Sequence, residues 1–368
     1  MAPQAIAAVG TQKGLFFVDG DTHAVKGPHF PDERFPAVEV SPDGAVIAAS
    51  VSEHWGPTLR RSTDFGETWT EHDERAIAFP EGLEWTDHWS HQTQPAAVVQ
   101  VWQLRRSPHD ANTIYAGTEP AAIFKSTDNA QTFQLNTGLW NHEHRPQWFP
   151  GGGGLGLHTI DIHPADPNTI HVAISTGGVY RTDDGGETWV ARNKGIAGAV
   201  GPDEDSEFGQ CVHKIGRDAA NPDRLYAQNH GGLYRTDDRG DTWLDIAPGV
   251  PSDFGFPLVA HPHKANTAYV IPLSYEQGRI VPDGQPMVWR TADAGASWQG
   301  LGSGLPAPAY LTVLRDAFDH DGAQPQLGLW FGARSGHVFH SADEGETWTT
   351  AAEYLPAVLC VRATTKNA

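Results

Sequence analysis

The octapeptide Thr182-Asp183-Asp184-Gly185-Gly186-Glu187-Thr188-Trp189 has counterparts along the whole chain. The other five copies begin at residues 62, 126, 236, 291 and 341. The third residues of all six copies are separated by 64, 56, 54, 55 and 50 positions. A repeat of about 50 residues that is rich in short strands is typical of β-propellers and not of helical solenoids. The repeat therefore predicts an all-β ring of similar blades.

The surroundings of the octapeptide predict four strands in each blade. In this copy, β-rich runs at 157–162, 169–173, 179–181 and 188–191 are separated by turn residues, which indicates a four-stranded antiparallel sheet. The octapeptide then joins the third strand to the fourth. Its aspartate can accept hydrogen bonds from turn N–H groups, its glycine can adopt positive φ, and its tryptophan can pack beneath the hairpin.

We expect these aspartates to be structural. One carboxylate per blade is spread around a ring, whereas a catalytic pair must lie within about 5–10 Å. The structural set is Asp64, Asp128, Asp184, Asp238, Asp293 and Asp343.

The two ends of the chain complete the ring. Residues 6–10 and 14–18 resemble a second and a third strand, and residues 357–361 resemble a first strand that has no blade after it. Joined, they predict a seventh blade that is closed by N- and C-terminal strands and leaves no open sheet edge. The expected fold is a seven-bladed β-propeller of four-stranded antiparallel blades, about 28 strands in all, with residues 1–368 as one domain.

The octapeptide resembles the Asp-box, or bacterial neuraminidase repeat, whose pattern is Ser/Thr-x-Asp-x-Gly-x-Thr-Trp. The segment 163–170 followed by Gly178-Val179-Tyr180-Arg181 is similar to the branch with longer blades, which includes xyloglucanases, sortilin-type receptors and photosystem II assembly factors. The resemblance implies a propeller whose boxes lie on the face away from the active site. It leaves enzyme, receptor and assembly factor open. The third blade departs from the pattern, with Asn129-Ala130 and Phe133.

Composition excludes several classes of partner. The 45 acidic residues outnumber the 25 basic ones and give a formal charge of −20, which argues against nucleic acid and anionic membranes. No stretch approaches the ~20 apolar residues that span a bilayer, and residues 1–6 lack the features of a signal peptide, so we expect a cytoplasmic protein. Cys211 and Cys360 fall at first-strand positions, where we expect core residues without a disulfide or a nucleophilic role.

Long loops indicate where a site would lie. They cover about 71–96, 138–156, 195–209 and 272–286, and three of the four join blades two to five. Because function accumulates in long loops, we expect a site on the face opposite the boxes, offset towards those blades. Loop tryptophans could stack on sugar rings or could simply hold the loops on the rim. The candidate ligand-binding residues are His54, Trp55, Trp89, Arg145, Trp148, His230 and Arg334.

Glycosidase chemistry requires one carboxyl as acid and another as base or nucleophile. Our candidates are Asp87, Glu143 and Glu207, with Glu84, Glu119 and Glu276 on the same face. The resemblance to sialidases implies six blades and an arginine triad. The seven blades predicted here, and loop arginines that the sequence does not place together, argue against that activity; those arginines are Arg34, Arg145, Arg279 and Arg334. The resemblance to xyloglucanases implies an active-site cleft between two propellers. The sequence of this chain predicts a single propeller, which argues against that activity.

Histidines allow a different chemistry. Aligning the first strands places His158 and His213 at equivalent positions, where blade three has Trp102 and blade six has Phe256. With loop histidines they could bind Zn, Mn or Fe, or they could make polar contacts between blades. The candidate metal ligands are His88, His91, His142, His144, His158 and His213.

Three functions follow from the sequence. We favour a glycosidase-type hydrolase or a propeller that binds carbohydrate or another small molecule. A non-catalytic protein-binding or assembly propeller is the first alternative. A metal-dependent enzyme with histidine ligands on the same face is the second.

Overall fold

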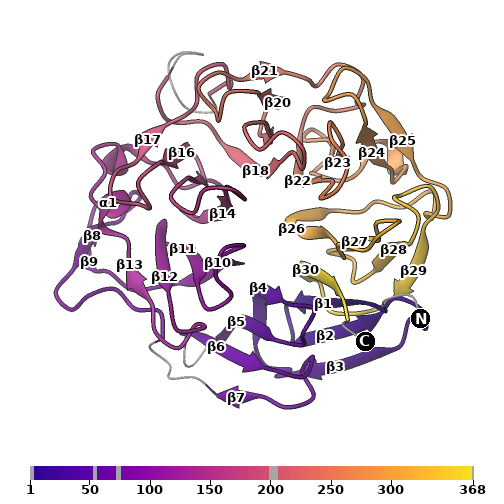
Figure 1. The fold of residues 1–368 in the computed structure, drawn as a ribbon, viewed down its shortest axis with the longest axis horizontal. Coiled ribbons are helices and arrows are strands. Elements are labelled where there is room, and N and C mark those ends of the chain that lie inside the picture. Colours follow the sequence, from indigo (N-terminus) through magenta and orange to yellow (C-terminus); the bar gives the residue numbers. More distant parts are fainter. Residues whose placement is uncertain (1–3, 53–55, 72–75, 199–205, 367–368) are drawn as a thin grey trace.

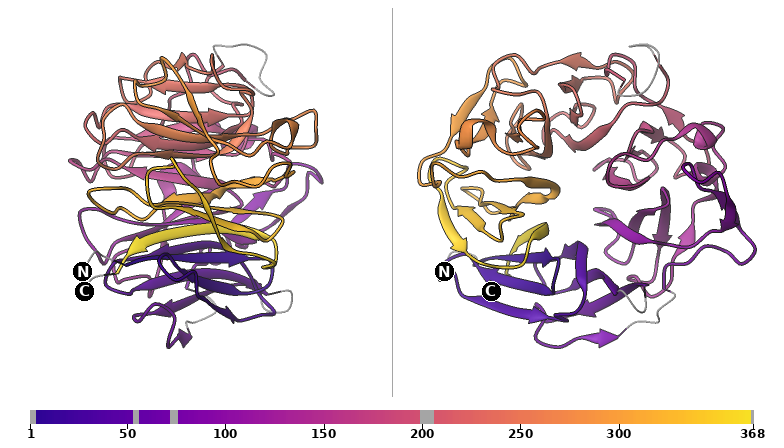
Figure 2. Two further views of the ribbon diagram at one scale, coloured as in Figure 1. Left: turned by 90° about the vertical axis from the view of Figure 1, so that its right-hand side faces the viewer. Right: turned by 180° about the vertical axis from the view of Figure 1, so that it is seen from behind.

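The computed structural model describes residues 4–52, 56–71, 76–198 and 206–366. Seven four-stranded antiparallel sheets are arranged around a central axis, as the sequence predicts (Figure 1). The side and reverse views show the sheets packed face to face around the ring (Figure 2). No helix among the described residues is long and apolar enough to span a bilayer.

We number the blades in chain order and give the strands from the axis outward. Blade one contains β30 (Val358–Thr365), β1 (Ala5–Thr11), β2 (Leu15–Asp19) and β3 (Val25–His29). Blade two contains β4 (Arg34–Val40), β5 (Val46–Ser52), β6 (Gly56–Ser62) and β7 (Thr70–Glu71). Blade three contains β10 (Gln100–Arg106), β11 (Ile114–Glu119), β12 (Ala122–Ser126) and β13 (Gln134–Leu135). Blade four contains β14 (Leu157–Ile162), β15 (Ile170–Ile174), β16 (Gly178–Thr182) and β17 (Val190–Ala191).

The remaining blades follow the same order. Blade five contains β18 (Val212–Arg217), β19 (Leu225–Asn229), β20 (Leu233–Thr236) and β21 (Leu244–Asp245). Blade six contains β22 (Gly255–Ala260), β23 (Ala268–Pro272), β24 (Val288–Thr291) and β25 (Gln299–Leu301). Blade seven contains β26 (Val313–His320), β27 (Leu329–Ala333), β28 (Val338–Ser341) and β29 (Thr349–Ala352). The connections hold the hairpin β8 (Glu84–Thr86) and β9 (Thr93–Pro95), the helix α1 (Thr137–Trp140), and the 3-10 turns η1 (Arg145–Gln147) and η2 (Pro282–Gly284).

Both ends of the chain build blade one, which confirms the predicted closure. β1 pairs with β30 in an antiparallel register that runs from Ala5 opposite Thr365 to Gly10 opposite Cys360. β30 is innermost, and the N and C marks lie beside each other in Figures 1 and 2. The predicted first strand at 357–361 is longer in the structure, where it reaches Thr365.

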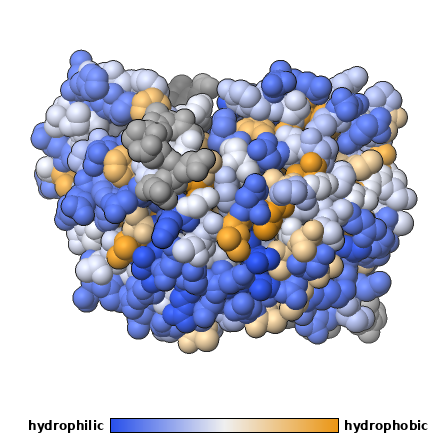
Figure 3. Space-filling view, turned by 90° about the horizontal axis from the view of Figure 1, so that it is seen from above, coloured by the Kyte–Doolittle hydropathy of each residue, from blue (hydrophilic) through white to orange (hydrophobic). Residues whose placement is uncertain are grey.

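The hydrophobic core lies between neighbouring blades. Inner and middle strands are covered on both faces by neighbouring blades, and all five residues of β15 are buried. The interface between blades two and three shows the packing, with Leu104 and Phe124 fully buried and Trp140 of α1 close by in the same cluster. The outer rim is different, since a side view shows a mostly hydrophilic surface with scattered apolar residues (Figure 3).

The repeated aspartates stabilise the turns between third and fourth strands, as expected. In all six turns, Oδ1 of the aspartate accepts the backbone N–H of the residue four positions later, at 2.8–2.9 Å. In blade four, Gly186 has a φ of +103°, and an added Cβ would meet Asn136 at 2.4 Å. Blade three uses Ala130 at φ +63° in that place. These carboxylates are therefore committed to the turns, and hydrogen bonds from Thr68 lower the pKa of Asp64 to about 2.

Candidate functional site

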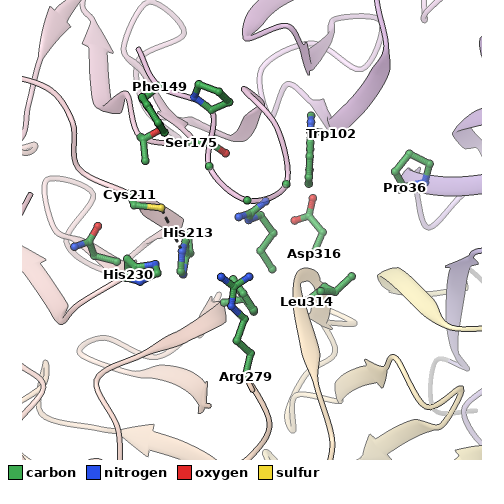
Figure 4. A pocket seen from close by; sticks show the side chains of 18 of the residues that line it. Pro36, Trp102, Phe149, Ser175, Cys211, His213, His230, Arg279, Leu314 and Asp316 are labelled. Atoms are coloured by element: carbon green, nitrogen blue, oxygen red, sulfur yellow. Dashed lines mark hydrogen bonds between the residues drawn. The ribbon is translucent and has the colours of Figure 1, made fainter. Parts of the chain in front are cut away.

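A cavity of about 970 Å³ opens on the axis of the ring (Figure 4). Its lining comes from the beginnings of first strands, such as Arg34 and Gln100, and from residues that follow second strands, such as Ser175 and His230. In an antiparallel blade these segments lie at the end opposite the third-to-fourth turns, so the cavity is on the face away from the repeated aspartates. All seven blades contribute residues. The cavity therefore lies on the axis, and the expected offset of the site towards blades two to five stays a prediction.

Bulges in the inner strands direct side chains towards the axis. The strand register shifts between Val101 and Gln103, between Leu157 and Thr159, between Val212 and Lys214, and between Gly255 and Leu258. A bulge re-aims the residue it contains. The bulged positions include Trp102, His158, His213 and Phe256, the four residues that the sequence alignment made equivalent. Trp102, His213 and Phe256 line the cavity.

Four arginines face the same cavity: Arg34, Arg279, Arg315 and Arg334. Within the described part of the chain, none of them forms an ion pair with a carboxylate. Arg34 donates from Nη1 to Oε1 of Gln100 at 2.7 Å. Arg279 and Arg334 are exposed on the loops that follow β23 and β27. Arg34, Arg279 and Arg334 were predicted from the sequence as loop arginines, although Arg34 begins β4 in the structure.

Arg315 is the most enclosed of the four. Its guanidinium carbon lies 5.1 Å from the ring centre of Trp102 and 5.8 Å from that of Phe256. Its Nε is buried without a hydrogen-bond partner, and burial lowers the pKa of the side chain. Arg315 was not among the predicted residues, because it is the third residue of β26 and the predicted arginines were loop residues. Its position in the repeat could have identified it. Arg315 lies near the start of a first strand, close to the positions that Trp102 and His213 occupy in their blades.

One carboxylate lines the cavity among the described residues, and it is already paired. Asp316 contacts Nζ of Lys214, accepts a hydrogen bond from Gln103 at 3.2 Å and lies 3.8 Å from Arg362. Burial favours the neutral form of Asp316, but Lys214 and Arg362 outweigh it and lower the pKa. These partners come from blades five, three and one, so the network also ties inner strands together across the axis.

Glu119 lies behind the cavity wall. Its Oε2 accepts hydrogen bonds from Trp102 Nε1 and Gln100 Nε2, each at 3.1 Å. Burial raises the pKa of this carboxyl group, against the opposing effect of these hydrogen bonds and of Arg34. The burial of Glu119 therefore favours its protonated form.

Cys211, His213 and His230 come together on one wall of the cavity (Figure 4). One ligand atom from each lies within 4.8 Å of the others. Cys211 is half-buried and lines the cavity, so its expected core location is wrong, whereas Cys360 is buried as predicted. Both cysteines are free. Of the six histidines predicted as metal ligands, His213 alone belongs to this group among the described residues.

Aromatic residues from two loops form part of the rim. Trp89 is 65% exposed and lies 4.9 Å from Phe149 between ring centres, and His88 lies 4.3 Å from the same ring. His91 is exposed, with its ring centre 6.3 Å from that of His88. Asp87 accepts hydrogen bonds from the backbone and hydroxyl groups of Ser90 at 2.8 Å, so it holds this turn. Of the predicted loop tryptophans that the structure describes, Trp89 lines the cavity.

His142 and His144 lie in a different cluster, against blade four. His142 Nε2 bonds the carbonyl of Trp189 at 3.2 Å, and its Nδ1 accepts the N–H of His144 at 3.0 Å. His144 bonds Tyr180 at 3.2 Å and lies 3.4 Å from Glu207. Both nitrogens of each ring therefore already have protein neighbours.

Trp148 and Arg145 have structural environments that differ from the expected ligand contact. Trp148 is 1% exposed and donates to Tyr180 at 2.8 Å. Arg145 stacks 3.4 Å from the ring centre of Trp140 and donates to the carbonyl of Ala121 at 2.5 Å. Neither side chain lines the cavity.

The remaining candidates are dispersed. His158 is fully buried beside Thr159, and its Nε2 has no hydrogen-bond partner. Glu143 is exposed. His54 and Trp55 lie outside the described residues.

Comparison with known proteins places the chain among propellers of two functional kinds. No family model matches it. It is 26% identical over 236 residues to a xyloglucanase from Paenibacillus sp, a match that covers 54% of this chain and 21% of that protein. It is 22% identical over 272 residues to the photosystem II assembly lipoprotein Ycf48 of Synechococcus sp. (strain CC9902). That match covers 72% of this chain and 66% of Ycf48. The chain thus spans about a fifth of the length of the xyloglucanase.

Solved structures agree on the fold. An ancestral GH74 enzyme superposes with a TM-score of 0.53 at 16% identity, covering 90% of this chain and 38% of that one. The structure of YCF48 bound to D1 peptide superposes with a TM-score of 0.53 at 13% identity. The superposition covers 95% of this chain and 84% of the YCF48 chain. The protein is a seven-bladed propeller with distant homology to GH74 xyloglucanases and to Ycf48.

Proposed function

We propose that this propeller binds a carboxylate-bearing ligand of the sugar-acid class in its axial cavity. The observation that carries the proposal is the set of four arginines around one cavity without carboxylate partners among the described residues. The chain has a formal charge of −20, so this concentration of positive charge runs against its overall balance. Guanidinium groups bind carboxylates through paired hydrogen bonds, and enclosure strengthens such pairs.

The walls of the cavity favour a ligand with a flat or apolar body. Trp102 and Phe256 flank Arg315, and Phe149 and Trp89 lie at the rim. Aromatic faces pack well against the C–H surface of sugar rings. A sugar acid combines that surface with an anionic group, and the arginines would fix its orientation.

The relatives support a ligand-binding face without choosing the ligand. By name, some of them act on xyloglucan, and one solved relative holds a peptide. The cavity favours an anionic ligand over a neutral glycan, since the only lining carboxylate among the described residues, Asp316, is held by Lys214 and Arg362. Binding rather than hydrolysis is the activity that this arrangement supports best.

Calorimetric titration tests the proposal. Galacturonate and glucuronate oligomers should bind, while galactose and glucose oligomers of equal length should bind at least tenfold more weakly. Arg315→Met and Arg334→Met should each weaken binding at least tenfold, about 1.4 kcal/mol. Arg290→Met, whose arginine pairs with Glu346 at 2.8 Å outside the cavity, is the matched control. Equal affinity for the neutral oligomers would contradict the proposal.

A peptide ligand is tested in the same instrument. Peptides with a free terminal carboxylate are compared with the same peptides carrying a terminal amide. Tighter binding of the free peptides than of any sugar acid would keep the anion site but replace the ligand class.

Glycoside hydrolysis is the second candidate, favoured by the similarity to xyloglucanases and by Glu119. The raised pKa of Glu119 suits a general acid, because such a group must be protonated at working pH. Release of reducing ends from xyloglucan, abolished in Glu119→Gln, would support this candidate over binding alone.

A further inference from the structure

We propose that Cys211, His213 and His230 form a mononuclear zinc site on the wall of the axial cavity. This inference is independent of the sugar-acid proposal, since it concerns other side chains and a different ligand. It also differs from the set of six histidines that the sequence suggested, because it uses a cysteine and His230.

The backbone brings the three residues together. His230 donates its N–H to the carbonyl of Cys211 at 2.9 Å, so the residues before β18 and after β19 lie side by side. Cys211 and His213 are two positions apart, and the bulge at His213 turns its ring towards the cavity. The three ligands therefore lie at or beside the neighbouring ends of β18 and β19 in one blade, where the backbone hydrogen bond holds them together.

The distances fit zinc. The Cys211 sulfur lies 3.6 Å from Nε2 of His213. In a tetrahedral site with Zn–S of about 2.3 Å and Zn–N of about 2.0–2.1 Å, sulfur and nitrogen ligands lie about 3.5 Å apart. All three ligand atoms lie within 4.8 Å of one another, so small rotations of the His230 side chain complete the set.

The outer contacts of His213 support metal binding. Its Nδ1 lies 2.5 Å from the carbonyl oxygen of Gly255 and donates its proton there. That hydrogen bond leaves Nε2 unprotonated and aimed at Cys211. Metal-binding histidines usually have such a second contact, which fixes the tautomer and the ring orientation.

His230 is held in place by packing. Its ring centre lies 5.1 Å from both Phe254 and Tyr275, and 5.6 Å from His213. These contacts fix the ring without using its nitrogens. A nucleophilic cysteine needs one imidazole as its base. The presence of both His213 and His230 beside Cys211 therefore favours metal binding over thiol catalysis.

The site would leave one coordination position open. Three protein ligands with a fourth position for water or substrate are the pattern of catalytic rather than structural zinc. The cavity is on the open side, and it contains Arg279 and Arg315. A thiolate on Cys211 would offset the nearby positive charge, and an anionic fourth ligand would be favoured.

Metal analysis tests the site on the full-length protein. After equilibration with zinc and removal of the excess, wild type should retain one equivalent by elemental analysis. Cobalt should give the intense near-ultraviolet absorption of a thiolate-to-metal transition. Cys211→Ser and His230→Ala should each lose the bound zinc and the cobalt band. Cys360→Ala, which removes the other cysteine, and His88→Ala, on the rim, should retain both.

Three results would overturn the inference: wild type that binds less than a tenth of an equivalent, Cys211→Ser that still binds zinc stoichiometrically, or a cobalt spectrum without thiolate character. Circular dichroism of each variant shows whether it is folded, and a variant that is not folded is replaced by Cys211→Ala or His230→Gln. Sugar-acid affinity is measured separately, so the two proposals fail independently.

Discussion

The ammonium group of Lys214 and the carboxylate of Asp316 form an ion pair that joins blade five to blade seven across the axis of the ring. Both side chains are buried. Buried charges are costly unless they are paired and hydrogen-bonded, and here Gln103 and Arg362 supply additional contacts to the carboxylate. Asp316 therefore lines the cavity, and its pairing with Lys214 couples inner strands.

Lys214→Met should destabilise the ring, because it leaves Asp316 without its closest cation. The expected loss is about 3–5 kcal/mol in the free energy of unfolding, measured by urea denaturation. Lys264→Met is the control, since the Lys264 side chain is 53% exposed and pairs with Glu344 at 2.5 Å, where a loss of about 0–1 kcal/mol is expected. Equal losses in the two variants would show that the axial pair is not a major source of stability.

Stability should fall as the pH decreases below about 6.5. Burial lowers the pKa of His340 from 6.5 to about 4, and the same cause lowers that of His261 to about 4. Between these values the unfolded chain binds more protons than the folded one, so acid favours unfolding, by about 1.4 kcal/mol per pH unit for each such histidine. Unfolding free energies between pH 7 and pH 4 measure the slope.

His340→Phe isolates one contribution. The phenyl ring can replace the imidazole that stacks on Trp330, whose ring centre is 3.9 Å away, but it cannot be protonated. The slope between pH 6.5 and pH 4 should become shallower, and His91→Phe, at an exposed position, should leave it unchanged. An unaltered slope in His340→Phe would contradict the assignment.

Asp184→Ala should lower the melting temperature more than Asp184→Asn. Asp184 accepts from both the N–H and the hydroxyl of Thr188, and an asparagine retains one acceptor oxygen. Affinity for the cavity ligand, measured per folded molecule, should be the same in both variants because this turn is on the opposite face. A folded Asp184→Ala protein that no longer bound ligand would refute the structural assignment.

Removing residues 357–368 should destabilise all blades together. β30 is the inner strand of blade one, and its loss exposes the edge of β1 and the apolar faces that pack against it. A single cooperative transition at a much lower temperature is expected by calorimetry. A truncated protein that melted within a degree or two of the full-length chain would show that closure contributes little.

The blades were predictable because their determinants are local. The contact of Asp184 with Thr188 spans four residues, so the turn chemistry is visible in the sequence. The cavity depends on contacts between distant residues. Cys211 was assigned to the core from its strand position, yet the pairing with His230 places it on the cavity wall.

Tryptophans show the same limit. Trp89 and Trp148 both lie on long loops that also contain histidines. The hydroxyl of Tyr180, 32 positions further along the chain, accepts from Trp148 and holds it in the core, while Trp89 stays 65% exposed. Sequence proximity therefore identified the loops but not the side chains that reach the axis.

The pairing of Gly10 with Cys360 sets an order of events during protein synthesis. β1 is synthesised before its inner neighbour β30, and 350 positions separate Gly10 from Cys360. Until residue 365 has emerged, one edge of β1 has no native partner, and the ring cannot close however many of its other blades have already folded. The inner edge of β1 therefore waits for its native partner while the six blades between the two strands are synthesised.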